Sequence, residues 1–200
     1  MAEIVLIRHG QTEWSANGRH TSYTDLELTE EGERQAGAVR DRLAGRTFAA
    51  VLSSPRRRAL RTAELAGLHV TEVTDDLAEW NYGEYEGITT AEIRKTRPDW
   101  SLWRDGCPGG ESPDEVAARL DRVLKRAADL LSAADLSAAD PLSGGDVALI
   151  AHGHSLRVAG ARWIGLPPSG GSLLKLDTAT ISVLGFEHAT DPVIATWNAR

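Results

Sequence analysis

Histidine and arginine side chains that could act together on a phosphate group occur in three segments far apart in the sequence. They are Arg8 and His9, the run 56–58, and the pair His152 and His154. Arginine binds phosphate oxygens two at a time, and backbone N–H groups after Gly10 and Gly153 could add donors. A neutral imidazole among such cations is a good nucleophile at phosphorus, because a covalent intermediate splits one difficult displacement into two easier ones. The residue types therefore indicate recognition and transfer of a phosphoryl group.

A carboxylic acid is also needed beside the leaving oxygen, and Glu79 and Glu84, in a loop rich in aromatic residues and glycine, are both candidates. Each group has a simpler interpretation as well. The arginine run could be the solvated face of a helix, and the histidines could be loop residues or metal ligands. Residue types alone leave these alternatives open.

Each histidine segment follows a short apolar run that is typical of a buried parallel strand. These runs cover residues 3–10 and 146–155, and a third covers 48–55. Helical patterns at 28–45, 56–67 and 112–135 alternate with them, a short strand is expected at 69–73, and terminal strands are expected at 178–188 and 193–199. This alternation predicts an α/β fold, a three-layer sandwich with a mostly parallel central sheet and helices on both faces. Ligands of such sheets lie beyond the carboxyl ends of the strands, where both histidine segments are expected.

Two of the helices have clear start signals. Thr29 is expected to cap the helix at 28–45, with acidic residues in its first turn. Ser112 and Glu115 form a capping box for the helix at 112–135, with Pro113 at the first helical position.

Length and composition indicate one domain over residues 1–200, with an elaborated loop region around 75–112. The net charge of -7 argues against a nucleic acid or an anionic membrane as partner. The single cysteine, Cys107, can form neither an intrachain disulfide nor a thiolate metal site. No signal peptide or apolar run of membrane-spanning length is found, so a cytoplasmic protein is expected.

Six motifs, in this order, cover nearly the whole chain. They are LIRHGQTEW at 6–14, TDLELTEEG at 24–32, SSPRRRALRTAE at 53–64, EWNYGEYEG at 79–87, GES at 110–112 and AHGHSLR at 151–157. Together they resemble the histidine phosphatase superfamily, in the branch that includes cofactor-dependent phosphoglycerate mutase. The joint pattern is highly specific, although no single tripeptide is.

The resemblance implies a role for each matched residue. His9 is expected to become phosphohistidine, and Arg8 and Arg58 to bind phosphate. A protonated His152 is expected to steady the transferring group, and Glu79 to protonate the leaving group and later act as base for water. The positions expected to bind substrate are Gln11, Thr12, Ser15, Thr21, Tyr82, Gly153 and His154. No metal and no cofactor are implied, and an optimum on the acid side of neutral is expected.

Two departures from the mutase pattern favour hydrolysis. Thr90 stands where a mutase carries a substrate-binding lysine, and Arg104 is followed by Asp105 in place of a second arginine. A narrower likeness to small-molecule phosphatases, among them a fungal sedoheptulose-bisphosphatase and actinobacterial acid phosphatases, points the same way. We therefore expect a metal-independent phosphomonoester hydrolase of the acid phosphatase type, acting on small sugar or sugar-acid phosphates.

Other functions remain open at this point. One is a phosphoglycerate mutase, and another is a domain that binds phosphorylated ligands without catalysis. A metallohydrolase would use His9, His152 and His154. A protein phosphatase would use the aromatic loop and the connector 133–145 as its rim. The resemblance is also compatible with a homodimer, with Trp163 and Trp197 either in its interface or in the core.

Overall fold

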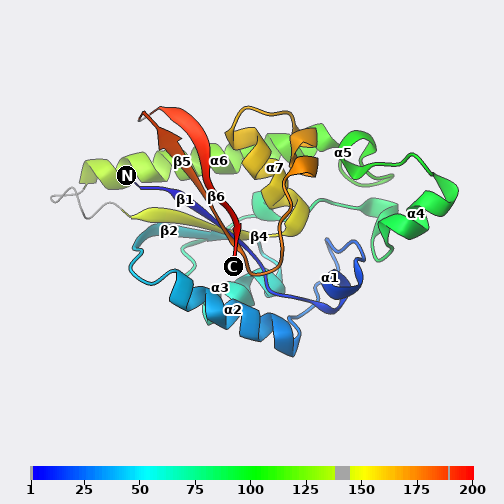
Figure 1. Ribbon diagram of the computed structural model, residues 1–200, viewed down its shortest axis with the longest axis horizontal. Helices are drawn as coiled ribbons and strands as arrows, with labels where there is room; N and C mark the ends of the chain where they lie inside the picture. Colours follow the sequence, from blue (N-terminus) through cyan, green and yellow to red (C-terminus); the bar gives the residue numbers. More distant parts are fainter. Residues whose placement is uncertain (1, 138–144, 189) are drawn as a thin grey trace.

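The computed structural model describes residues 2–137, 145–188 and 190–200 (Figure 1). Most of the connector 133–145, on which the protein-phosphatase rim depends, therefore lies outside the described residues or lacks described side chains. In the part of the chain that is described, no helix combines the length and the apolar character needed to cross a membrane.

A single six-stranded sheet organises the described residues, with the strand order β3-β2-β4-β1-β5-β6. The strands are β1 (Ile4–Arg8), β2 (Phe48–Ser53), β3 (Glu72–Val73), β4 (Asp146–Ala151), β5 (Ile181–Glu187) and β6 (Asp191–Ala199). The first four pair in parallel, and β5 and β6 add two antiparallel strands beside β1. The mostly parallel sheet predicted from the sequence is thus confirmed, although the strand expected at 69–73 contains only two residues.

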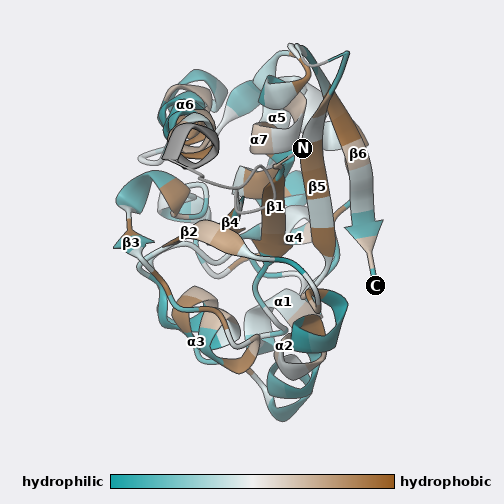
Figure 2. Cartoon of the chain, turned by 90° about the vertical axis from the view of Figure 1, so that its left-hand side faces the viewer, coloured by the Kyte–Doolittle hydropathy of each residue, from teal (hydrophilic) through white to brown (hydrophobic). Residues whose placement is uncertain are grey.

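Helices cover both faces of this sheet, as Figures 1 and 2 show. Helices α2 (Glu30–Arg42) and α3 (Arg57–Leu65) pack on one face, and α6 (Pro113–Ser137) and α7 (Gly153–Trp163) pack on the other. Alternate residues of β1 supply the two cores, since Ile4 and Leu6 join the α6 side whereas Val5 and Ile7 join the α2 side. The three-layer arrangement predicted from the sequence is confirmed.

Short elements gather beyond the carboxyl ends of the parallel strands (Figure 1). They are α1 (Glu13–Asn17), η1 (Asp75–Leu77), η2 (Gly83–Tyr85), α4 (Thr90–Thr96) and α5 (Leu102–Asp105), and η3 (Pro168–Leu173) follows α7. Most of them belong to the loop region 75–112. Helix α1 was not predicted, because its five residues are too short to show an apolar period.

The predicted helix starts are confirmed. The side chain of Thr29 accepts the N–H of Gly32 at the start of α2. Ser112 and Glu115 form the reciprocal capping box, in which Ser112 donates to the Glu115 carboxylate and the Glu115 N–H donates to the Ser112 hydroxyl. Such caps satisfy N–H groups that have no partner inside the helix.

The glycine after His9 has a steric reason. A Cβ on Gly10 would lie 2.3 Å from the carbonyl oxygen of Gly32, in the first turn of α2. Only a residue without a side chain lets the chain leave β1 this close to the helix.

Candidate active site

The register of β1 against β4 brings the two histidine segments together. Arg8 lies opposite Ala151 in the parallel ladder, and the N–H of His9 donates to the carbonyl of Ala151. The next residue of each chain segment is therefore a histidine at the same edge of the sheet. The rings of His9 and His152 lie 5.0 Å apart, centre to centre, in an edge-on arrangement.

The ring of His9 is buried and held in one tautomer. Its Nδ1 lies 2.7 Å from the carbonyl oxygen of Gly10, and since a carbonyl can only accept, Nδ1 carries the proton. Burial lowers the pKa of His9 well below 6.5, and the charges of Arg58 and Arg8 lower it further. The imidazole is therefore neutral, and its Nε2, which carries the lone pair, makes no hydrogen bond to the described residues.

His152 is fully buried behind this ring and is also neutral. Its Nδ1 accepts a hydrogen bond from Nε of Arg58 at 3.2 Å, so Nε2 carries the proton and donates to the hydroxyl of Ser54 at 2.7 Å. Burial, the charge of Arg58 and the neighbouring His9 lower the pKa of His152 well below 6.5. The expectation of a protonated His152 is therefore wrong, because its Nδ1 accepts from Arg58 and burial lowers its pKa. A protonated His152 therefore gives no reason to expect a pH optimum on the acid side of neutral.

Arg58 is fully buried, and its guanidinium group holds the loop that follows α1. Nη1 donates to the carbonyl of Thr24, and Nη2 donates to those of Thr21 and Ser22. Thus Arg58 reaches the histidines only through His152. The structure brings it to the predicted site but places it behind the surface that a ligand would touch.

Arg8 has the donor that Arg58 lacks. Its Nη1 donates to the carbonyl of Leu176, whereas its Nε is buried without a hydrogen-bond partner among the described residues. A Cβ on Gly153 would lie only 3.3 Å from the guanidinium carbon of Arg8, so the guanidinium group can approach the start of α7 this closely because residue 153 is a glycine. Burial lowers the pKa of Arg8, and the charge of Glu79 partly opposes this effect. A buried guanidinium with an unused donor can bind an anion that reaches it.

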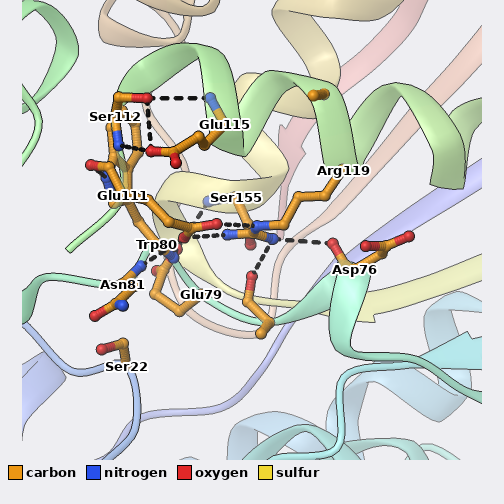
Figure 3. Close-up of polar contacts among 12 residues, drawn as sticks. Ser22, Asp76, Glu79, Trp80, Asn81, Glu111, Ser112, Glu115, Arg119 and Ser155 are labelled. Carbon is orange, nitrogen blue, oxygen red and sulfur yellow. Dashed lines mark hydrogen bonds and ion pairs between the residues drawn. The ribbon is translucent and has the colours of Figure 1, made fainter.

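Glu79 lies at the amino end of α7 (Figure 3). Its Oε1 accepts the N–H groups of Ser155 and Trp80 at 2.8 and 2.9 Å, and its Oε2 accepts the N–H of His154 at 3.0 Å. The first turn of a helix offers unpaired N–H groups and a positive end of the dipole, which is why a carboxylate docks there. With a single N–H bond, Oε2 keeps a free position for a transferable proton.

A cavity of about 210 Å³ opens in front of His9. Nine of the predicted site residues line it, namely Arg8, His9, Thr12, Ser15, Thr21, Glu79, Tyr82, Gly153 and His154. Arg58 and His152 lie behind it. Gln11 does not line it, since its side-chain oxygen accepts from Thr29 at the start of α2, and its backbone N–H donates to the side chain of Gln35 within that helix.

Two of the lining residues serve α1 as well. The hydroxyl of Thr12 accepts the N–H of Ser15, and the hydroxyl of Ser15 accepts the N–H of Thr12 and donates to its carbonyl. Ser15 is therefore at the predicted place, with its hydroxyl proton already used. Thr21 likewise donates to the carbonyl of Arg19.

An aromatic cluster closes the outer part of the cavity. The hydroxyl of Tyr82 lies 2.6 Å from Nδ1 of His154, and His20 stacks on the Tyr82 ring at 4.6 Å. Burial lowers the pKa of His20 to about 4 and that of His154 well below 6.5, whereas it raises the pKa of Tyr82. The cluster is thus uncharged at neutral pH.

The sequence analysis missed His20 and Arg157, which both line the cavity. Arg157 lies over the Trp103 ring at 4.5 Å and donates to the carbonyl of Gly171. The spacing offered a signal for Arg157, because it lies one helical turn after Gly153 and so on the same face of α7. Nothing in the pattern around His20 distinguishes it from a surface loop residue.

Across the described ranges, no group of three histidine, cysteine, aspartate or glutamate residues is arranged to hold a metal ion. The nitrogen atoms of His152 are both occupied, by Arg58 and Ser54. The metallohydrolase alternative therefore finds no ligand set among these residues.

Comparison with known proteins gives a consistent result. The family model described as histidine phosphatase superfamily (branch 1) matches residues 4–200. An acid phosphatase from Mycobacterium tuberculosis is 46% identical over 192 residues, which cover 92% of this chain and 87% of the relative. The sedoheptulose 1,7-bisphosphatase of Saccharomyces cerevisiae is 37% identical over 186 residues, which cover 81% and 67%. The solved structure of the Rv3214 open reading frame product of Mycobacterium tuberculosis superimposes with a TM-score of 0.90 at 42% identity, covering 99% of this chain and 97% of that one.

The neutral histidines predict how stability depends on pH. The pKa values of His9, His20, His152 and His154 are lowered in the folded protein, so below pH 6.5 the unfolded chain takes up protons that the folded chain does not. The free energy of unfolding should therefore be highest above this pH and fall as the pH decreases, by about 1.4 kcal/mol per pH unit for each such imidazole. Urea unfolding between pH 7.5 and 5.0 measures this slope. The variant His20→Gln should have a slope smaller by about one proton, and an unchanged slope would contradict the assignment.

Proposed function

The chain belongs to branch 1 of the histidine phosphatase superfamily, and on that premise we propose that it hydrolyses small sugar or sugar-acid phosphates through a phosphohistidine at His9, without a metal. Family membership and the similarity to named phosphatases make it a phosphatase. The roles of individual residues and the substrate class are the content of the proposal.

One observation carries the proposed mechanism. His9 is a buried neutral imidazole whose Nδ1–H is fixed on the Gly10 carbonyl, and it lines the same cavity as Glu79 and Arg8, whose buried Nε has no partner among the described residues. A nucleophile, an anion-binding donor and a carboxyl group thus meet in one small space. These are the three functions that displacement at a phosphomonoester requires.

In the first step, Nε2 of His9 attacks the phosphorus atom in line with the ester oxygen. The N–P bond forms as the P–O bond to the alcohol breaks. Arg8 and the positive amino end of α7 stabilise the charge on the transferring group. Glu79, protonated on Oε2, gives its proton to the departing oxygen.

In the second step, water attacks the phosphorus atom of the phosphohistidine. The ionised Glu79 takes a proton from the water, the new P–O bond forms and the N–P bond breaks. Phosphate leaves, and both His9 and Glu79 are returned to their starting states. The Nδ1–H bond to Gly10 keeps Nε2 as the reacting atom throughout.

Arg58 and His152 support this chemistry from behind His9. The charge of Arg58 lowers the pKa of His9, and its hydrogen bonds hold His152 and the loop that follows α1. A direct phosphate contact from Arg58 would require exchange of the carbonyl contacts to Thr21, Ser22 and Thr24.

Hydrolysis is favoured over a mutase reaction by the outer cavity. Thr90 lines it where a mutase lysine is expected, and its hydroxyl contacts His20. Arg104 lies outside the cavity and is paired with Asp105. A mutase must retain a doubly phosphorylated intermediate, and these positions supply no positive charge for that purpose.

The substrate class is supported by the size of the cavity and by the relatives. A volume of about 210 Å³ suits a small phosphomonoester rather than a folded phosphoprotein. The names of two similar proteins, acid phosphatase and sedoheptulose 1,7-bisphosphatase, also support small phosphomonoesters as the substrate class. The net charge of -7 argues for a small metabolite rather than a nucleic acid or an anionic membrane as partner, and we place the enzyme in the cytoplasm. Trp163, considered above for a homodimer, packs on Phe186 of its own chain.

Replacing His9 by alanine should abolish the phosphoenzyme and lower kcat by on the order of 10³-fold or more, since the nucleophile is lost. Phosphate release from 4-nitrophenyl phosphate and trapping of an acid-labile phosphoprotein measure the two effects. His69→Ala, at an exposed position after α3, is the matched control and should behave as wild type. Normal turnover in His9→Ala would refute the assignment of His9 as the nucleophile.

Replacing Glu79 by glutamine should affect poor leaving groups most, because they need the proton. We expect kcat/KM to fall about 10²-fold or more for phenyl phosphate and much less for 2,4-dinitrophenyl phosphate, whose alcohol leaves unprotonated. Glu84, the other candidate from the sequence, is exposed and does not line the cavity, so Glu84→Gln is the control. If Glu79→Gln lowers kcat/KM equally for the two esters, Glu79 is not the proton donor to the leaving group.

Incubation with 3-phosphoglycerate and a catalytic amount of 2,3-bisphosphoglycerate should release inorganic phosphate and form no isomer, because Thr90 is uncharged and Arg104 lies outside the cavity, so the two mutase positions supply no charge to retain the intermediate. A parallel panel of sugar phosphates, sugar-acid phosphates and phosphopeptides, ranked by kcat/KM, should favour the small substrates. Formation of 2-phosphoglycerate as main product, or preference for the peptides, would contradict the proposed substrate class.

A further inference from the structure

Glu79 lies on a segment that no regular element supports. Residues 78–82 run between η1 and η2 without helix or strand structure. The carboxyl group is bonded at the amino end of α7, but its backbone must be held from another side. A proton donor that is displaced by about 1 Å loses much of its effect, so the groups that hold this backbone matter for the reaction.

Arg119, on α6, binds the backbone immediately before Glu79 (Figure 3). Its Nη1 donates to the carbonyls of Asp76 and Ala78 at 2.9 and 2.7 Å. Its Nε and Nη2 donate to the two carboxylate oxygens of Glu111 at 2.7 and 3.0 Å. This is the two-pronged geometry that an arginine can adopt and a lysine cannot.

Glu111 binds the backbone immediately after Glu79. Its Oε2 accepts the N–H of Asn81 at 2.8 Å, and its own N–H donates to the carbonyl of Asn81 at 2.9 Å. Its carbonyl accepts the indole N–H of Trp80 at 2.9 Å. The pair of Arg119 and Glu111 therefore contacts the chain on both sides of Glu79.

The pair is largely removed from water, with side-chain exposures of 9% for Arg119 and 22% for Glu111. A buried ion pair has a large desolvation cost, and replacing it by apolar residues is often neutral for stability. Fold stability is therefore a weak explanation for an ion pair at this place. Holding a particular backbone geometry is a use that only polar groups with fixed directions can fulfil.

We propose that Arg119 and Glu111 are positioning residues, which fix the segment 76–81 so that the carboxyl group of Glu79 stays within reach of the leaving oxygen. The inference rests on the proposed function, in that Glu79 must be the proton donor for the positioning to matter. The pair does not touch the substrate and acts only through Glu79.

The test compares kcat/KM for phenyl phosphate and 2,4-dinitrophenyl phosphate, because this constant covers only the steps up to departure of the alcohol. Arg119→Gln should lower kcat/KM for both esters unequally, with a fall for phenyl phosphate that is about tenfold or more larger than the fall for the dinitrophenyl ester. Arg119→Lys, which keeps the charge but loses the two-pronged contact, should give an intermediate ratio. Glu111→Gln, whose amide oxygen can still accept from Asn81, is the second variant and should change the ratio in the same direction.

Arg122→Gln is the matched control. Arg122 lies one turn further along α6 and pairs with the carboxylate of Asp76 on the exposed surface, without contacting the backbone around Glu79. Its loss should leave the ratio of the two esters unchanged. A fall of equal size for both esters in the Arg119 and Glu111 variants would reduce the pair to a structural role and overturn the proposal.

The Glu79→Gln background separates this inference from the function on which it rests. If Arg119 acts through Glu79, the double variant Glu79→Gln/Arg119→Gln should have the ester ratio of Glu79→Gln alone. A ratio changed by Glu79→Gln but not by the Arg119 and Glu111 variants would refute the positioning role and leave the proposed function intact. A ratio unaffected by Glu79→Gln would instead refute the proton-donor role itself.

Discussion

Parallel pairing of β1 with β4 is the constraint on which the site depends. Because Arg8 lies opposite Ala151, the chain leaves both strands at the same height, and His9 and His152 emerge side by side. The helix that follows β4 then begins at Gly153, so its amino end faces the same place. A shift of one residue in this register would turn the side chains of one strand to the opposite face and separate the two rings.

Desolvation sets the chemistry of the groups so assembled. Burial among cations keeps the imidazoles of His9 and His152 neutral, and Nε of Arg8 finds no partner within the described part of the chain. The cavity lining also has an excess of positive charge, because Arg8, Arg19 and Arg157 face a single carboxylate, Glu79. In the mechanism that we propose, the phosphate dianion of the substrate balances this excess of positive charge, which favours its binding.

The carboxyl group of Glu79 is placed by contacts other than the pairing of β1 with β4. Glu79 comes from an irregular segment, and it is held at its side chain by the first turn of α7 and at its backbone by Arg119 and Glu111. Helices α6 and α7 pack on the same face of the sheet, so the contacts of the Glu79 side chain with α7 and of its neighbouring backbone with Arg119 come from the same layer. The two groups that we propose to react, His9 and Glu79, thus lie in irregular segments, while helices and strands determine where these segments lie.

The sequence by itself determined the α/β architecture, the helix starts at Thr29 and Ser112, and the appearance of His9 and His152 at strand ends, because periodicity, capping and strand termination are local properties of the chain. Recognition of the ordered motifs added the family and the role that we propose for Glu79. Only the tertiary structure decided that Arg58 and His152 lie behind the cavity, that His152 is neutral, and that Gln11 faces α2 instead of the ligand. The same holds for His20 and for the contacts of Arg119, since burial, protonation and side-chain direction are set by residues far away in the sequence, and no local pattern encodes them.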